Sequence, residues 1–224
     1  MNAPPLLELI ARRHCKRAFL DLPVDRRLLA AVLQTAANAP SSKNTQSWQV
    51  EVLTGGTRDE LSRRLCEAFD RQVAPAPDYA NRPDQPDAVL QQREAAYGAA
   101  LLAHARVDRH DDSARLRHRR RNFVFFDAPV ELIFHLPGNA APGNFLDLGC
   151  FMQNVALGLL ALGLGCCPQF SVASYSPLIH ELLGWEEKRC VVAGMAVGHF
   201  DSDHPDNQFV PTRVPLAEFC QWHD

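Results

Sequence analysis

Two short segments hold most of the side chains in this sequence that could do chemistry. The first, called here the basic segment, is residues 12–17 and reads Arg-Arg-His-Cys-Lys-Arg. Its four certain positive charges repel one another, a cost that proteins usually accept where an anion collects them. The second, the small-polar loop, is residues 39–48 and reads Ala-Pro-Ser-Ser-Lys-Asn-Thr-Gln-Ser-Trp. Cations followed by short polar side chains and an aromatic ring indicate a site for a phosphate with a ring system attached.

The basic segment also has a simpler explanation, as the exposed end of a helix. Cations are favoured near a helix C-terminus, where they interact with its dipole, but this effect accounts for only one or two charges. It does not explain five donors beside a loop whose hydroxyls and amides can hydrogen-bond a flat heterocycle. We therefore favour a binding site.

Sequence motifs for several other chemistries are incomplete or missing. Gly163-Leu164-Gly165 follows an expected helix and lacks the third glycine of a dinucleotide-binding fingerprint. The sequence contains neither a G-x-x-x-x-G-K-S/T phosphate loop nor a G-x-S-x-G nucleophile elbow. The stretch from His199 to His204 offers imidazoles and carboxylates, but its spacing matches no usual zinc site, so we expect a polar turn there.

An arginine-rich run at residues 115–121 could contact nucleic acid. However, Asp108, Asp111 and Asp112 lie just upstream, no aromatic residues interleave with the arginines, and the chain is net negative. We expect a solvated helix face, or a face that meets an anionic substrate or a partner subunit.

The composition is that of an ordinary soluble enzyme. The chain has 224 residues, 46% of them hydrophobic, and a net charge of −3, so we expect one domain spanning residues 1–224. Its seven cysteines are odd in number and form no C-x-x-C, which indicates reduced thiols in a cytoplasmic protein. The longest apolar run, residues 155–167, falls short of the ~20 residues that span a bilayer.

Hydrophobic periodicity predicts a mixed α/β or α+β domain in which helices are in the majority. We expect the first helix to begin at Pro4 or Pro5, with Leu6, Leu9 and Ile10 facing inward, and Asp25 to cap the second. The proline-rich stretch 73–87 is expected to be a lid, a partner contact or a disordered patch. The remaining expected helices are 25–38, 57–71, 88–106, 111–120, 145–162 and 177–183, and the expected strands are 48–53, 130–136 and 190–197.

Four motifs, in order and covering nearly the whole chain, resemble those of the FMN-dependent nitroreductase family. The family patterns are R-R/H-S-x-R/K-x-F, A-P-S-x-x-N-x-Q-P-W, G-L-G-x-C-P-Q, and C-G-x-A-x-G-x-x-D followed by N and R-x-P-L-x-E-F. The similar stretches here are residues 13–19, 39–48, 163–169, and 193–201 with Asn207 and residues 213–219. Together they are specific to the family, though not to a substrate.

The resemblance implies an α+β homodimer with a central, mostly antiparallel sheet and a long core helix at the dimer interface. It also implies two FMN sites shared between subunits and NADH or NADPH as a transient co-substrate. Arg13, His14, Cys15 and Arg17 would hold the FMN phosphate, the ribityl chain and the N1/O2 edge of the ring. The other implied cofactor residues are Pro40, Ser41, Ser42 and Asn44 from the partner subunit, Cys167, Pro168 and Gln169 near N5/O4, and Arg213 at the phosphate.

The chain departs from the family patterns at three positions. Cys15 replaces a hydroxyl, which would weaken one hydrogen bond to an S–H contact. Ser47 replaces the proline before Trp48, and Val210 stands where relatives often carry a second arginine. These differences bear on how tightly FMN binds.

The resemblance implies an oxidoreductase that passes electrons from NAD(P)H by a ping-pong mechanism to a nitroaromatic, a quinone or a similar flat acceptor. The flavin carries the redox chemistry, so no protein acid or base is named as catalytic. Two alternatives stay open. One is another flavin reaction, such as dehalogenation or flavin fragmentation, and the other is a flavin-free dimeric binding module with Arg115–Arg121 as its contact surface.

Overall fold

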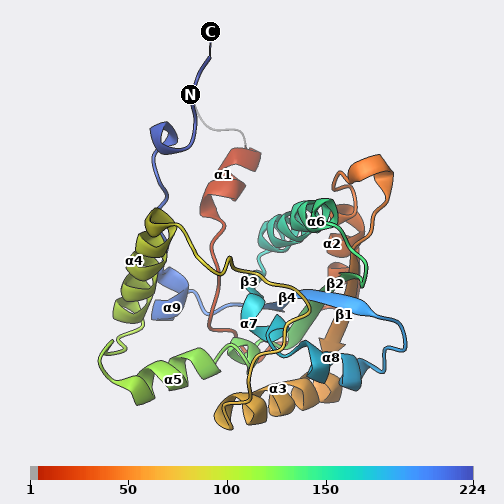
Figure 1. Ribbon diagram of the computed structural model, residues 1–224, viewed down its shortest axis with the longest axis horizontal. Helices are drawn as coiled ribbons and strands as arrows, with labels where there is room; N and C mark the ends of the chain where they lie inside the picture. The colour runs from red at the N-terminus through yellow and green to blue at the C-terminus, as the bar shows by residue number, and fades with distance from the viewer. Residues whose placement is uncertain (1–4, 224) are drawn as a thin grey trace.

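The computed structural model describes residues 5–223 and has a four-stranded antiparallel sheet at its centre (Figure 1). The strands are β1 (Gln49–Thr54), β2 (Val130–Pro137), β3 (Gly165–Gln169) and β4 (Arg189–Gly198). Their order across the sheet is β1-β2-β4-β3, so β1 and β3 form the two edges. The antiparallel sheet that the resemblance implied is confirmed.

Hydrophobic side chains cover both faces of the sheet, since β2 and β4 are buried along almost their whole length. Alternate residues of β2 point to opposite faces, as strand geometry requires. Leu132 and Phe134 belong to one apolar cluster and Ile133 belongs to the other. The two central strands therefore carry both cores.

Helices form a layer on each face of the sheet (Figure 1). On one face lie α2 (Arg26–Ala36) and α6 (Pro142–Ala161), which pack on the cluster that contains Leu132. On the other face lie α3 (Gly55–Asp70), the one-turn α7 (Phe170–Ala173) and α8 (Ser176–Leu183). As predicted, Asp25 caps α2 by accepting a hydrogen bond from the Arg27 amide.

The remaining elements lie outside these layers. They are α1 (Pro5–Arg12), α4 (Ala88–His104), α5 (Asp112–Arg120), α9 (Pro205–Gln208) and three short 3₁₀ turns at Ser42–Asn44, Phe125–Asp127 and Leu216–Glu218. The proline-rich stretch 73–87 has no regular structure, but part of it is anchored to β4. Asp78 accepts a hydrogen bond from the Val191 amide, and the Tyr79 hydroxyl donates to the Val192 carbonyl.

The expected helices and strands all occur, with boundaries that differ by one to three residues at most ends. Strand β3 was not predicted. It is five residues long and contains Pro168, a residue that usually argues against a strand. An edge strand tolerates proline because the missing amide need not face a neighbouring strand.

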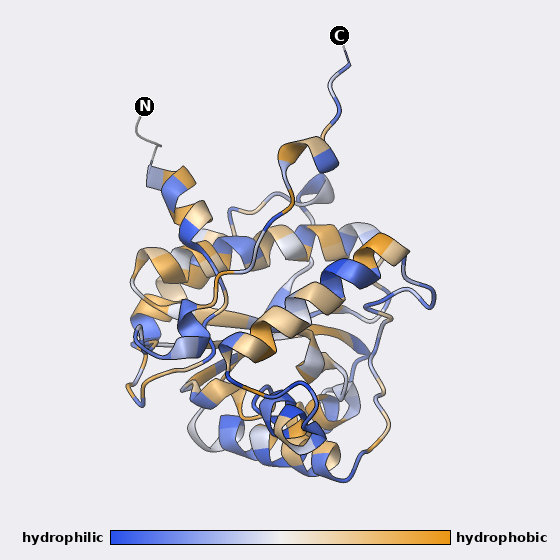
Figure 2. Cartoon of the chain, turned by 90° about the vertical axis from the view of Figure 1, so that its left-hand side faces the viewer, coloured by the Kyte–Doolittle hydropathy of each residue, from blue (hydrophilic) through white to orange (hydrophobic). Residues whose placement is uncertain are grey.

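The prediction that α1 faces inward is wrong for the single chain. Leu6 is 60% exposed and Ile10 is 45% exposed, and α1 has no buried residue. Figure 2 shows why: α1 and the C-terminal segment both project from the same side of the body. The alternative helix start at Pro4 lies outside the described residues.

Helix α6 also leaves apolar surface uncovered. By length and composition it is the one helix of the described chain that is apolar enough to cross a membrane. One face of α6 packs on the sheet through Leu148, Phe151 and Val155. On the other side of α6, Leu146 is 75% exposed. The single chain therefore leaves part of the apolar surface of α6 uncovered.

Candidate functional site

The basic segment lies along the outer edge of β3. The Lys16 amide donates a hydrogen bond of 3.0 Å to the Cys166 carbonyl, and farther along Phe19 forms an antiparallel bridge with Phe200. Gly165 allows this close approach, because a Cβ there would lie 2.8 Å from side-chain carbons of both Lys16 and Phe200. The glycine of the third motif thus has a packing role next to the site.

Asn207 anchors the basic segment to the C-terminal part of the chain. Its side-chain oxygen accepts hydrogen bonds from the amides of Arg17 at 2.6 Å and Ala18 at 3.2 Å. Its side-chain nitrogen donates to the carbonyls of Ala18 and Asp201, each at 2.7 Å. Asn207 is 2% exposed, so these bonds are shielded from water. Asn207 stood in the fourth motif, but it was not among the predicted site residues.

The side chains of the basic segment divide into two groups. Lys16 turns inward, where Nζ donates a hydrogen bond to the Asn207 carbonyl and lies over the Phe200 ring. Burial, and to a smaller extent the charge of Arg12, lower the pKa of Lys16. His14 also turns inward, with Nε2 2.9 Å from the carbonyl oxygen of Asn207. Arg13 and Arg17 are half-buried, and Arg17 donates a bond of 2.8 Å to the Tyr97 hydroxyl of α4. Arg13 and Arg17 are thus the cations best placed to meet an anion, and His14 would meet it through its backbone.

Cys15 differs from an ordinary thiol. Its interaction with the Cys167 side chain, followed by the charges of Arg17 and Arg13, lowers the pKa of Cys15 to about 5 despite burial. The same interaction with Cys15, together with burial, raises the pKa of Cys167 well above its ordinary value. The lowered pKa favours the thiolate form of Cys15 near neutral pH.

The small-polar loop has a compact structure of its own. Lys43, Asn44 and Gln46 adopt positive φ angles of 52°, 56° and 46°, a region that non-glycine residues seldom occupy. The Ser41 hydroxyl accepts a bond from the Gln46 amide, and the Ser42 amide donates to the Asp147 carboxylate at the start of α6. The side chains of Ser42 and Asn44 remain exposed.

The small-polar loop and the basic segment lie at opposite corners of the sheet. The loop leads into β1 at Gln49, which pairs with His135 at one end of the central strands. The basic segment borders β3 at Cys166, which pairs with Val197 at the other end of β4. Three strand spacings of about 4.8 Å and several residues of about 3.4 Å each separate the two corners. The two segments therefore form separate surfaces of one chain.

The remaining predicted residues divide between β3 and the C-terminal segment. Cys167 and Gln169 are buried and Pro168 is half-buried on β3, whose outer backbone edge is taken up by the basic segment at Cys166. Arg213 is exposed and donates only to the nearby carbonyls of Pro211 and Thr212 among the described residues. Among the described residues Arg213 makes no hydrogen bond or ion pair with the basic segment.

Two segments considered in the sequence analysis as other kinds of binding site, the arginine-rich run 115–121 and the stretch from His199 to His204, make contacts within the chain. In the arginine-rich run, Arg115 pairs with Asp112, Arg120 with Asp70 and Arg121 with Asp206, so these charges are balanced within the chain. His204 accepts a bond from the Asp206 amide at the start of α9. Within residues 5–223, no group of three or more His, Cys, Asp or Glu side chains could hold a metal ion.

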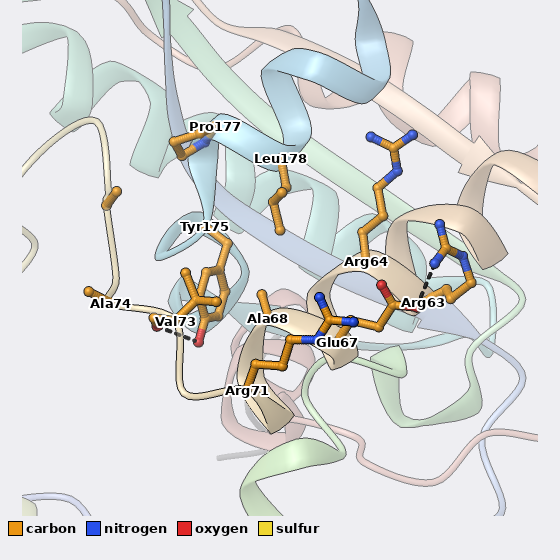
Figure 3. Close-up of a pocket in the computed structure, with 11 residues that line it drawn as sticks. Arg63, Arg64, Glu67, Ala68, Arg71, Val73, Ala74, Tyr175, Pro177 and Leu178 are labelled. Atoms are coloured by element: carbon orange, nitrogen blue, oxygen red, sulfur yellow. Dashed lines mark hydrogen bonds and ion pairs between the residues drawn. The ribbon is translucent and has the colours of Figure 1, made fainter.

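A cavity of about 410 Å³ lies on the other helical layer, between α3, α8 and the start of the proline-rich stretch (Figure 3). Tyr175, Pro177 and Leu178 form one wall, and Arg63, Arg64 and Arg71 lie opposite. Arg63 and Arg64 both pair with Glu60, so their charge is partly neutralised. None of the predicted cofactor residues lines this cavity.

Known proteins resemble this chain over almost its whole length. The sequence profile described as the Nitroreductase family matches residues 10–199. The chain is 35% identical to 4-nitrobenzoate reductase of Pseudomonas putida, over 96% of this chain and 93% of that protein. It is 34% identical to nitrobenzene nitroreductase of Ectopseudomonas oleovorans, over 97% of this chain and 96% of that protein.

Solved structures agree with the sequence matches. The crystal structure of NfnB from Sphingopyxis sp. strain HMH, described as an FMN- and NADPH-dependent nitroreductase, superposes with a TM-score of 0.94 at 33% identity. The match covers 99% of this chain and 100% of that one. An FMN-dependent NfnB from Mycobacterium smegmatis, in complex with NADPH, gives a TM-score of 0.93 at 29% identity over 98% of each chain.

Proposed function

The chain belongs to the nitroreductase family, and on that basis we propose that it is an FMN-dependent oxidoreductase. It passes electrons from NADPH or NADH to a nitroaromatic compound, a quinone or a similar flat acceptor. The names of its relatives favour nitroaromatic acceptors over dehalogenation or flavin fragmentation. We also propose that the chain forms one cofactor-binding domain and works in the cytoplasm, in keeping with its seven free cysteines.

The observation that carries this proposal is the half-buried pair Arg13 and Arg17 beside the edge of β3, with the Arg17 backbone held by Asn207. Guanidinium groups bind phosphate through paired charge-assisted hydrogen bonds, and a cation near N1 favours the reduced flavin. Past Cys166, where the basic segment bonds to it, β3 would offer its remaining backbone groups to the rim of a flat ring. The donor types present therefore fit FMN.

We propose that the functional unit is a homodimer with FMN sites shared between subunits. In one chain the small-polar loop lies far from the basic segment, and the apolar residues Leu6, Ile10 and Leu146 are exposed. A second copy that covers this apolar surface could supply Pro40, Ser41, Ser42 and Asn44 to the basic segment of its partner. Arg213, on the projecting C-terminal segment, would complete the phosphate site (Figure 2).

In such a site the protein binds and orients, while bound FMN supplies the transfer of electrons between nicotinamide and acceptor. Arg13 and Arg17 would neutralise the phosphate, and Asn207 fixes the backbone of Arg17. Cys167, Pro168 and Gln169 of β3 would contact the ring. One pocket that first admits NAD(P)H and then the acceptor requires no dinucleotide-binding fold, which agrees with the missing fingerprint.

The flavin-free binding module is less well supported, because three arginines of its proposed contact surface, Arg115, Arg120 and Arg121, are paired within the chain. The test is the absorbance of the purified protein near ~450 nm, where bound flavin absorbs, followed by anaerobic titration with NADPH or NADH. We expect bleaching by the nicotinamide and recovery of colour on addition of 4-nitrobenzoate or nitrobenzene. A colourless protein that takes up no added FMN would refute the proposal.

A further inference from the structure

Two cysteines face each other beside the basic segment. The Lys16 amide bonds to the Cys166 carbonyl, and farther along Phe19 lies beside Gly198 and Phe200, at and beyond the start of β3. The basic segment therefore runs antiparallel to β3, and this register places Cys15 and Cys167, one residue from the bonded pair, opposite each other. The next backbone bond in that register would come from the amide of residue 168, which is a proline and has none. Cys15 and Cys167 thus occupy a non-hydrogen-bonded antiparallel pair. In such pairs the Cα atoms are about 4.5 Å apart, a distance that a disulfide can span.

Cys15 packs against the apolar cluster that contains Cys167, and each thiol shifts the pKa of the other. Cys15 is half-buried beside Arg13 and Arg17, whereas Cys167 is 2% exposed within the apolar cluster under β3. A thiolate held by cations is the nucleophilic form of cysteine, and Cys167 keeps its proton. The pair therefore combines an attacking sulfur with a protonated thiol next to it.

Three of the other cysteines are poorly placed to compete. Cys166 points to the opposite face of the sheet, where it belongs to the cluster packed under α6. Cys66 is buried in α3, and Cys150 is on the exposed side of α6. Strand alternation thus selects Cys167 over its neighbour Cys166 as the partner of Cys15.

We propose that Cys15 and Cys167 form a hydroperoxide-reactive thiol pair that closes to a disulfide, an activity separate from flavin chemistry. The Cys15 thiolate attacks the peroxide, its O–O bond breaks, and Cys15 becomes a sulfenic acid while the leaving alkoxide takes a proton from water. Cys167 sulfur then attacks the Cys15 sulfur. An S–S bond forms, the S–O bond breaks, and the hydroxyl leaves as water with the Cys167 proton.

In this sequence two thiols lose two electrons, and one hydroperoxide is reduced to an alcohol and water. A dithiol reductant restores both thiols by exchange. The disulfide would join the basic segment covalently to β3 and remove the negative charge of Cys15 from beside Arg13 and Arg17. Peroxide would in this way alter the surface that we assign to the FMN phosphate.

The test treats the purified protein with one equivalent of hydrogen peroxide at neutral pH, alkylates the remaining thiols, and maps peptides by mass spectrometry without reduction. We expect the loss of two of the seven thiols and a Cys15–Cys167 cross-linked peptide that dithiothreitol reverses. Seven alkylated cysteines, or a bridge between other cysteines, would overturn the proposal. Wild-type protein alone decides this outcome, so it does not depend on whether a variant folds.

Three variants refine the assignment. In Cys167→Ser we expect a sulfenic acid at Cys15 that dimedone traps, and in Cys15→Ser neither the adduct nor the bridge. Cys150→Ser is the matched control, and it should still form the bridge. An unmodified Cys15 in a folded Cys167→Ser protein would contradict the proposal. The readout is thiol content, so a protein that binds no FMN would refute the proposed function without affecting this result.

Discussion

The Asn207 side chain holds the Arg17 backbone, accepting a hydrogen bond of 2.6 Å from the Arg17 amide across 190 residues of sequence. The same side chain bonds to both backbone groups of Ala18. Asn207 thereby fixes the strand-like path on which the two candidate phosphate-binding arginines are carried. Asn207 is therefore a positioning residue: it acts through Arg17 and Ala18, and its side chain is not proposed to contact the cofactor.

We expect Asn207→Ala to destabilise the fold and to weaken FMN binding together. The substitution leaves the buried amides of Arg17 and Ala18 without their acceptor, a cost of about 1–3 kcal/mol. Chemical denaturation and flavin fluorescence titration measure the two effects. Asn38→Ala is the control, because Asn38 only donates to the Thr35 carbonyl at an exposed helix end. Equal stability of the Asn207 variant and wild type would contradict the anchoring role.

Loss of an arginine that binds phosphate should cost affinity without loss of fold. We expect Arg17→Ala and Arg213→Ala each to weaken FMN binding by about 1.5–3 kcal/mol, the range for a hydrogen bond to a charged group. Arg12→Ala is the matched control, since Arg12 belongs to the same segment but lies outside the family motif. Isothermal titration with FMN gives the affinities. If Arg12→Ala costs as much as Arg17→Ala, general positive charge and not specific contact holds the phosphate.

Much of this fold could be read from the sequence, and the reasons are local. Helix α2 was predictable because Asp25 caps it and its apolar residues recur at helical spacing. Strand β4 was predictable because ten residues with almost no polar side chain fill a buried strand. Strand β3 was missed, since its five residues include a proline and its pairing depends on β4, far along the chain.

The residues of the candidate site could be proposed from the sequence, but their arrangement could not. The four motifs identified the basic segment, yet the inward turn of His14 and Lys16 depends on the Asn207 carbonyl, a contact between distant parts of the chain. The lowered pKa of Cys15 likewise depends on Cys167, from a distant part of the chain, as well as on Arg17 and Arg13. The exposure of α1 could not be foreseen from its periodic apolar residues, because periodicity identifies a face that will be covered and not what covers it.

The Cys15 thiolate should make FMN binding pH-dependent. Its pKa of about 5 means that Cys15 gains negative charge as pH rises from below 5 to neutrality, next to the arginines that would hold the phosphate. This charge opposes the gain in FMN affinity that ionisation of the phosphate brings over the same range. In Cys15→Ser the gain should be larger and the affinity at pH 7 higher. The FMN phosphate titrates near ~6 in both proteins, so the difference between them isolates Cys15. Parallel pH profiles would contradict this effect.

A buried carboxyl group should make the fold itself pH-dependent. Glu131 of β2 is fully buried, and among residues 5–223 neither of its oxygens has a hydrogen-bond partner. Burial raises the pKa of Glu131 well above its ordinary value, against the opposing charge of Arg58. An acid whose pKa is raised by folding destabilises the protein as pH rises above its unfolded pKa of about 4.3, through the interval up to the folded value.

The isosteric variant Glu131→Gln cannot ionise and should remove that decline. We expect the variant to be more stable than wild type at pH 8 and its stability to vary less between pH 5 and pH 8, as measured by urea denaturation. Glu186→Gln is the control, because Glu186 is an exposed carboxylate. An unchanged pH profile in Glu131→Gln would show that Glu131 does not control this stability.

The shared site can be tested by mixing two defective chains. If the basic segment of one protomer binds FMN with the small-polar loop of the other, a dimer of one Arg17→Ala chain and one Asn44→Gly chain has two unequal sites. One site carries both lesions, and the other carries neither. Glycine is chosen at position 44 because the backbone there has a positive φ of 56°, which glycine adopts without strain.

We expect the mixed dimer, isolated through different tags on its two chains, to bind one FMN per dimer with wild-type affinity. Each variant homodimer should bind FMN weakly at both sites. If both segments of a site came from one chain, every site in the mixed dimer would carry one lesion, and no tight site would remain. Titration of the mixed dimer with FMN therefore distinguishes the two arrangements by stoichiometry, and a chain that stays monomeric would rule out the shared site altogether.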